Sequence, residues 1–262
     1  MAMVDLLETY REGIVTLTFN RPAKRNAMSL DMLAAMAETL NRHALDPLTR
    51  VLILTGAGDA FCAGGDISSM ESRSDMPLIE LAESLHQRQQ AFRRLQTFPK
   101  PVIARIRGVA VGAGLSMALA CDFRVADRSA RLGTAFAHIG LSGDNGISWL
   151  LSKLVGSAKA RELLMLGDIL DAHTALAAGL ITSLVEEDLL DAETDRLARR
   201  LASAPPVALG CIKRNLQAAE HLGLAEAMGI ESMSQASCMH TSDHKEGIAA
   251  FLEQRPPAFQ GR

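Results

Sequence analysis

The stretch KPVIARIRGVAVGAGLSMALACDFRVAD, residues 100–127, decides how the whole chain is interpreted. It begins with the compact apolar run 101–108, reaches two closely spaced glycines at 112 and 114, and continues through MALAC into the apolar run 121–127. Short apolar runs rich in β-branched residues are typical of strands buried on both faces of a parallel sheet. The stretch therefore predicts a strand, a glycine turn, a helix and a second strand in succession.

The same alternation extends to both sides of this stretch. Helical patterns at 29–45, capped by Ser29, and at 78–98, ended by Pro99, separate further β-rich runs. Alternating strands and helices indicate an α/β architecture. The remaining strands are expected at 13–19, 50–56 and 180–186, and shorter helices at 147–155, 158–166 and 171–178.

After about residue 188 the pattern becomes wholly helical. We place a boundary in this region and divide the chain into an α/β body, residues 1–195, and a helical region, residues 196–262. A helical block appended to an α/β body often packs against a neighbouring subunit. Its methionines at 228, 233 and 239 are interpreted as apolar packing.

Composition excludes several classes of function. A chain of 262 residues with 48% hydrophobic and 22% charged residues can bury a full core. The net charge of -3 and scattered basic residues argue against nucleic-acid binding. The four cysteines, at 62, 121, 211 and 238, lack metal-ligand spacing and fit a reducing cytoplasm, so no metal is expected. No export signal or membrane anchor is predicted, because the longest apolar run is shorter than the ~20 residues of a span.

The segment VGAGLS, residues 111–116, allows three interpretations. A phosphate loop fails, because the Lys-Ser/Thr pair of the Walker pattern and the third glycine of the dinucleotide pattern are missing. A nucleophile elbow around Ser116 fails, because Ala118 replaces its second glycine. The third interpretation is an oxyanion hole, in which backbone N–H groups before a helix face a developing negative oxygen. A glycine turn that comes first in the chain, FCAGGD at 61–66, follows another predicted strand and supplies a partner donor.

Taken together, several segments resemble the crotonase family, the enoyl-CoA hydratase/isomerase superfamily. They are FNRPAKRNAM, LTGAGDAFCAGGDI, the stretch 100–127, GLSGDNGISWLLSKLVG, AAGLITSLVE and EGIAAFLEQRPPAFQGR. The resemblance implies a spiral of ββα units that binds acyl-CoA, followed by a C-terminal trimerisation region, assembled as a homotrimer or dimer of trimers. It implies an acyl-CoA thioester as substrate, with coenzyme A as part of that substrate and no separate cofactor. Its thioester oxygen would lie between the amides of Gly65 and Ala113.

The sequence departs from the hydratase pattern at two positions. Where enoyl-CoA hydratases carry their catalytic glutamates, this chain has Ser116 and Phe136. Neither side chain can exchange a proton as a carboxylate does at neutral pH. Hydration by two glutamates is therefore not expected, and Phe136 is assigned to the wall of the acyl pocket. Ser116 is assigned either to a hydrogen bond with substrate or water, or to a small filler in the helix.

One acid remains near the expected site. Asp144, in SGDNG before a predicted helix, matches the aspartate that some enoyl- and dienoyl-CoA isomerases use as a base and that 4-chlorobenzoyl-CoA dehalogenase uses as a nucleophile. Gly-Asp-Asn-Gly is also a turn composition, so a structural role is the alternative. A dehalogenase is disfavoured, because the chain has one Trp and one Tyr and carries Gln89 where the histidine of that enzyme aligns, with His86 three residues away.

The favoured function is an enoyl-CoA isomerase with Asp144 as the proton shuttle. The alternative is a hydratase-like protein without the two glutamates, acting as a weak hydratase or as an acyl-CoA binder. The resemblance places substrate binding at the turns around both predicted donors. It implies that Lys24 and Arg25 face the phosphates; the alternative is that both are solvated surface charges. The remaining assigned positions are Ala27, Ala63, Asp66, Ile67 and Gly112.

Overall fold

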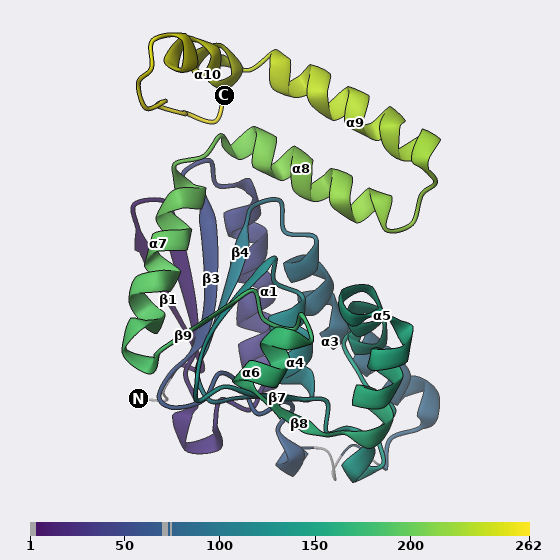
Figure 1. Ribbon diagram of the computed structural model, residues 1–262. Helices are drawn as coiled ribbons and strands as arrows, with labels where there is room; N and C mark the ends of the chain where they lie inside the picture. Colours follow the sequence, from purple (N-terminus) through teal and green to yellow (C-terminus); the bar gives the residue numbers. More distant parts are fainter. Residues whose placement is uncertain (1–3, 70–72, 74) are drawn as a thin grey trace.

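The computed structural model describes residues 4–69, 73 and 75–262 and contains a six-stranded sheet in the order β1-β2-β3-β4-β6-β9 (Figure 1). Strand β1 is antiparallel to β2, and the other neighbours in this sheet are parallel. The five strands predicted from apolar runs are confirmed, whereas β1 was not predicted. The strands are β1 (Leu6–Arg11), β2 (Ile14–Phe19), β3 (Val51–Gly56), β4 (Val102–Ile106), β6 (Phe123–Asp127) and β9 (Ser183–Val185).

Helices cover both faces of this sheet, which explains why its central strands are apolar throughout. On β3, Leu52 and Leu54 join the large core beneath α1 (Leu30–Leu45), α3 (Leu78–Gln96) and α4 (Ala113–Leu119). Their neighbours Val51 and Ile53 join a smaller core under α7 (Leu190–Ala202). Successive side chains of a strand point to opposite faces, so a sheet covered on both sides requires apolar residues at every position.

A second, three-stranded sheet carries the chain from β4 into α4. Strand β5 (Val109–Val111) pairs in parallel with β7 (Arg131–Gly133), which pairs antiparallel with β8 (Ile169–Asp171). The short helix α6 (Ala172–Ala177) follows β8. The predicted helices 147–155 and 158–166 form one element, α5 (Ile147–Leu166), which is kinked at Gly156 with φ 76° and ψ 160°. These connections place α4 and the start of α5 against one another.

The last three helices stand apart from the sheet, beyond the amino end of β3 (Figure 1). They are α8 (Pro206–Ala219), α9 (Leu224–Met239) and α10 (Ser242–Leu252). The predicted boundary between residues 195 and 196 falls inside α7, which packs on the sheet through Leu190 and Ala198. The region separated from the sheet therefore begins after Ala202. Among the residues that the structure describes, no helix has the length and apolar character of a membrane span.

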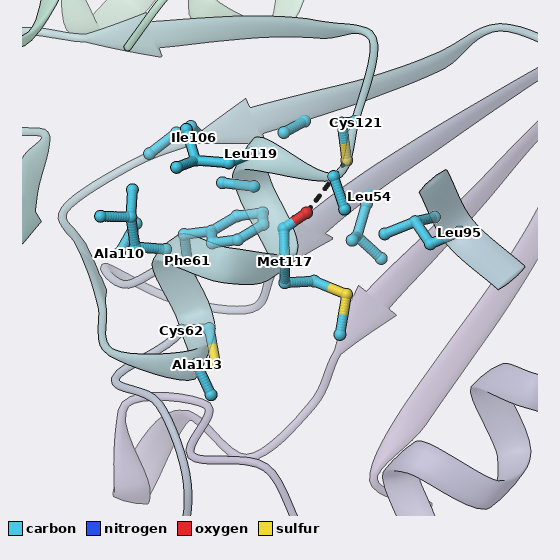
Figure 2. Close-up of a cluster of buried hydrophobic side chains, with 14 of the residues drawn as sticks. Leu54, Phe61, Cys62, Leu95, Ile106, Ala110, Ala113, Met117, Leu119 and Cys121 are labelled. Carbon is cyan, nitrogen blue, oxygen red and sulfur yellow. Dashed lines mark hydrogen bonds between the residues drawn. The ribbon is translucent and has the colours of Figure 1, made fainter. Parts of the chain in front are cut away.

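Buried side chains pack against the first turn of α4. Phe61, Cys62 and Met117 are fully buried, and Figure 2 shows Cys62 beside Ala113 at the first turn of the helix. Burial raises the pKa of the Cys62 thiol to about 12, so the thiol is neutral at physiological pH and behaves as a small apolar group. The helix start is thus fixed by close packing on the 61–62 segment.

Candidate active site

Backbone hydrogen bonds hold the two glycine turns side by side. On one side of the 62–66 segment, the Cys62 N–H donates to the Val109 carbonyl over 3.0 Å, and the Val111 N–H donates to the Cys62 carbonyl over 3.1 Å. On the other side, the Met28 N–H donates to the Gly64 carbonyl over 2.8 Å. The 62–66 segment therefore lies between the residues before α1 and strand β5.

This pairing leaves the amides of Gly65 and Ala113 without acceptors among the residues that the structure describes. The Gly64 carbonyl and the Asp66 N–H both bond to Met28, so the intervening Gly65 N–H points to the opposite side, where β5 leads into α4. Ala113 is the first residue of α4, and the first N–H groups of a helix have no acceptor within it. Within the described part of the chain, neither amide donates a hydrogen bond. Two spare N–H groups therefore lie in adjacent turns.

Close approach explains the glycines of these turns. Gly112 precedes α4 with φ 55° and ψ −125°, a conformation that residues with a Cβ rarely adopt. A Cβ on Gly114 would lie 2.1 Å from the Cys62 carbonyl oxygen, which is far inside contact distance. A Cβ on Gly64 would lie 3.5 Å from the Ala113 nitrogen, so the two turns are in contact. The glycines allow α4 to begin directly against the first turn.

Asp144 lies in the loop before α5 and is tied to both α3 and α4. Its Oδ1 accepts a hydrogen bond from the Gln89 Nε2 of α3 over 2.6 Å and another from the Asn145 N–H over 2.6 Å. Its main-chain carbonyl accepts one from the Ser116 hydroxyl of α4 over 3.1 Å. The structure thus places the predicted acid against the helix whose first residue is Ala113.

The backbone conformation of the turn around Asp144 depends on its neighbours and not on Asp144 itself. Gly143, Asn145 and Gly146 have φ values of 109°, 58° and 75°, so the turn needs glycine and asparagine there. The residue that caps α5 is Gly146, and no side chain accepts a capping hydrogen bond at this end. Asp144 is therefore not the cap of α5, although its half-buried carboxylate accepts the Asn145 N–H within the turn.

Ser116 and Phe136, at the positions where the family resemblance places the hydratase glutamates, carry no acid. The Ser116 side chain is 0% exposed and its hydroxyl donates to the main chain of Asp144. This burial agrees with the assignment of Ser116 to a small filler in the helix, and its contact with a substrate stays a prediction. Phe136 is 7% exposed and its ring lies 3.9 Å from the position of a Cβ on Gly112. Phe136 therefore forms a wall directly behind the second glycine turn.

The residues assigned to coenzyme A form a charged cluster beside the first turn. Asp66 Oδ2 lies 2.9 Å from Lys24 Nζ and 2.9 Å from Arg21 Nη2. Hydrogen bonds from Ser68 and from both cations hold the pKa of the Asp66 carboxyl well below its ordinary value. Lys24 is thus anchored rather than loosely solvated. Arg21 was missed from the sequence, although it stands in the quoted motif FNRPAKRNAM.

The other assigned binding residues surround this cluster. Arg25 is exposed, and its carbonyl accepts a hydrogen bond from the Ala63 N–H over 2.9 Å. Ala27 is buried next to the same turn, whereas Ile67 is 65% exposed. Segments 24–27 and 63–67, far apart in sequence, are therefore brought together at one edge of the site, and their contact with a substrate stays a prediction.

Gln89 is the residue of this site that sequence reasoning did not assign to it. It stands where the dehalogenase histidine aligns, and its amide contacts Asp144. His86 is exposed and lies 3.2 Å from the amide of Gln90, and no hydrogen bond joins it to Asp144 in the described part of the chain. A cavity of about 610 Å³ between α3, α5 and α8 includes Gln89 and Asn145 in its lining, but neither predicted donor.

Known proteins with similar sequences and structures agree on the family. Residues 9–262 match the enoyl-CoA hydratase/isomerase family model. The chain is 38% identical to the 1,2-epoxyphenylacetyl-CoA isomerase of Escherichia coli, over 99% of this chain and 100% of that protein. It is 34% identical to the crotonyl-CoA hydratase of Syntrophomonas wolfei, over 99% of each. The crystal structure of a putative enoyl-CoA hydratase from Streptomyces coelicolor superposes with a TM-score of 0.95 at 39% identity, covering 100% of this chain and 96% of that one. The chain has the crotonase fold and belongs to the enoyl-CoA hydratase/isomerase family, which acts on acyl-CoA thioesters.

Proposed function

We propose that this protein is an enoyl-CoA isomerase in which Asp144 moves a proton between two carbons of the acyl chain. The observation that carries the proposal is the placement of Asp144. It is the acid fastened to α4 through the Ser116 hydroxyl, in a site where both hydratase glutamate positions hold residues without a carboxylate. A single carboxylate suits isomerisation, because the same group removes a proton and returns it without consuming water.

In this proposal the amides of Gly65 and Ala113 stabilise the negative charge that develops during the reaction. Removing a proton from the carbon next to the thioester carbonyl puts negative charge on the carbonyl oxygen. We assign the N–H groups of Gly65 and Ala113 to that oxygen, where each donor contributes about 3 kcal/mol to transition-state stabilisation. Both amides belong to tightly packed turns, so they need no rearrangement when the charge develops. This assignment is supported by their adjacency and by their lack of acceptors among the described residues.

The coenzyme A moiety is assigned to the edge formed by residues 24–27 and 63–67. Lys24, held by Asp66, and the exposed Arg25 offer positive charge to its phosphates. The acyl chain is assigned to the side of the site walled by Phe136 and Gly112, which lie behind the Ala113 donor. These assignments follow the resemblance, and the packing of the two segments against each other supports them.

Relatives of this chain include both isomerases and hydratases, so the choice between them rests on this site. A protein 38% identical is a 1,2-epoxyphenylacetyl-CoA isomerase, and another, 33% identical, is the 2,3-dehydroadipyl-CoA hydratase of Escherichia coli. The absence of carboxylates at positions 116 and 136 favours the isomerase. The same absence supports the second candidate, an acyl-CoA binder with weak or no hydratase activity.

The deciding experiment compares wild type, Asp144→Asn and Asp188→Asn with 3-enoyl-CoA thioesters, following double-bond position by NMR and mass spectrometry. We expect wild type to form the 2-enoyl isomer and Asp144→Asn to lose about 10²- to 10⁴-fold in kcat, as expected for removal of a general acid/base, with little change in thioester binding. Asp188, exposed in the turn before α7, is the matched control and should behave as wild type. Tight binding without turnover in wild type would identify the binder. Hydration by wild type that survives in Asp144→Asn would contradict the isomerase proposal.

A further inference from the structure

We propose that Gln89 is a positioning residue for Asp144 and that the proton is carried by Oδ2 of that carboxylate. The inference rests on the proposed isomerase function and adds the atom that reacts and the residue that orients it. It comes from the hydrogen bonds around Asp144, which divide the two carboxylate oxygens into one that is held and one that is left for the substrate.

Oδ1 is the held oxygen. It accepts the Gln89 side-chain amide and the Asn145 main-chain N–H, each over 2.6 Å. Both distances lie just below the usual range for N–H donors to a charged carboxylate, a class of hydrogen bond stronger than bonds between neutral groups. Oδ2 accepts no hydrogen bond from any residue that the structure describes. The oxygen without a donor is the one available to take a proton from carbon.

The main chain of Asp144 is fixed independently of its carboxylate. The Ser116 hydroxyl donates to the Asp144 carbonyl over 3.1 Å, and Ser116 itself is fully buried in α4. Gln89 lies in the middle of the 19-residue helix α3 and is half-buried, so its side chain is confined by its surroundings. One end of Asp144 is therefore anchored to α4 and the other to α3, which leaves Oδ2 little freedom to move.

The hydrogen bonds to Oδ1 can form in both protonation states of Asp144. Oδ2 takes a proton from C2 of a 3-enoyl thioester, and the C–H electron pair moves through C1 onto the thioester oxygen to give a dienolate. The same oxygen then returns the proton to C4 as the electrons flow back, which leaves the double bond between C2 and C3. No oxidant, water or other reactant is consumed. While Oδ2 carries the proton, Oδ1 is a carbonyl oxygen that still accepts both N–H groups.

Because residue 89 is a glutamine, its side chain can orient the Asp144 carboxylate but cannot transfer a proton. An amide neither accepts nor releases a proton at neutral pH, whereas a histidine can do both. Gln89 therefore cannot activate a water molecule, and its contribution is the direction in which it holds Oδ1.

The first test replaces Gln89 with methionine, which keeps the length of the side chain and removes the donor. We expect Gln89→Met to lower kcat for isomerisation about 10-fold, the size expected for losing one hydrogen bond to a charged group, with KM changed by less than about 2-fold. Gln90→Met is the matched control, because Gln90 is adjacent on α3 and bonds to His86 instead of Asp144. Circular dichroism and thermal unfolding establish that both variants fold.

The second test follows the proton itself. With substrate deuterated at C2, a well-held carboxylate delivers part of the label to C4, and a loosely held one loses it to solvent before delivery. We expect the retained label to fall in Gln89→Met and to match wild type in Gln90→Met. A merely structural role for Gln89 would leave the label ratio unchanged. An unchanged kcat and label ratio in Gln89→Met, or equal losses in both variants, would overturn the inference.

A third measurement separates this inference from the proposed function. Crystal structures of wild type and Gln89→Met report the Asp144 side-chain orientation whatever the activity. We expect one orientation, with Oδ1 on Gln89, in wild type and a rotated or divided side chain in the variant. Retention of the wild-type orientation without Gln89 would refute the positioning role. A wild type that binds thioesters without isomerising them would refute the proposed function and the role of Oδ2, while the orientation measurement would still decide whether Gln89 positions Asp144.

Discussion

Gly114 shows how little space the start of α4 has at the level of a single residue. A methyl group there would lie 2.1 Å from the Cys62 carbonyl oxygen and 3.0 Å from its Cβ, and main-chain atoms cannot turn aside as a flexible side chain does. The helix would have to move away from the 62–65 turn. Since the two unpartnered amides lie on either side of this contact, the movement would also separate them.

We therefore expect Gly114→Ala to lower the free energy of unfolding by about 2 kcal/mol or more, as for other overpacked cores, and to reduce isomerisation more than thioester binding. Urea denaturation and steady-state kinetics measure the two effects. Gly229→Ala is the matched control, because a Cβ on Gly229 in α9 meets no atom within 4 Å and the change should slightly stabilise the helix. A stable, fully active Gly114→Ala protein would show that the two turns tolerate separation.

Part of the candidate site was accessible from the sequence for a clear reason. Asp144, Gly65 and Ala113 stand in motifs whose order along the chain can be compared with a family, and the structure brings their segments together. The Gln89 contact could not be predicted, because its partner lies 55 residues away and the hydrogen bond depends on how α3 packs. The burial of Ser116 fits one of its two sequence-based assignments, the small filler in the helix, but serine is common in both settings and the sequence did not decide between them.

At the level of elements, β1 is joined to α1 by a cluster around Glu8. The Arg42 guanidinium and the His43 ring, both on α1, lie 2.7 Å and 2.9 Å from the Glu8 carboxylate. Hydrogen bonds from Arg42, and then from His43, lower the pKa of Glu8 from 4.5 to about 2. A carboxyl whose pKa is lowered on folding stabilises the fold above its ordinary pKa, and this contribution disappears as the pH falls toward 2.

We expect Glu8→Gln to lower the free energy of unfolding by about 1 kcal/mol at pH 7, because the Arg42 and Glu8 side chains are 55% and 30% exposed and solvent screens such pairs. The difference from wild type should shrink as the pH is lowered from 4.5 to about 2, measured by urea denaturation at each pH. Glu83→Gln, at an exposed position of α3, provides the comparison. A difference that stays constant over this range would contradict the assignment of the low pKa to Glu8.

Strand β1 was missed because its pattern is that of an edge strand. Only Leu6 of its six residues is buried, so the apolar run or strict alternation that revealed the other strands is absent. The three-residue strands β5, β7 and β8 were missed because each is too short to show a pattern by itself, whereas the equally short β9 was predicted as part of the longer run 180–186. The long buried strands were predictable, because burial on two faces leaves a compositional signature.

For the whole molecule, the C-terminal helices expose apolar side chains that the chain alone does not cover. Leu216 of α8, Met233 of α9 and Phe251 of α10 are 65%, 70% and 83% exposed. Exposed apolar groups gathered on one region mark association surfaces. We expect the protein to form a homotrimer or a dimer of trimers through these helices, as the family resemblance implies.

Light scattering coupled to size exclusion measures this expectation. Met233→Glu should shift the mass toward the monomer, because it would place a carboxylate without a partner in an apolar contact. Met165→Glu is the control, since Met165 is 73% exposed on α5, away from these helices. A monomeric wild type would contradict the assembly prediction and would leave the fold and the site as described.

The packing of α7 also bears on how the chain is made. Val51, Ile53 and Ile103 lie on the face of the sheet that α7 covers, yet the helix is encoded some 90 to 150 positions later. While the ribosome is still translating the intervening segments, this apolar face has nothing to cover it. Nascent chains are most prone to aggregate when such surfaces stay open to water. We therefore expect the nascent chain to be most prone to aggregate in the interval before residue 202 emerges.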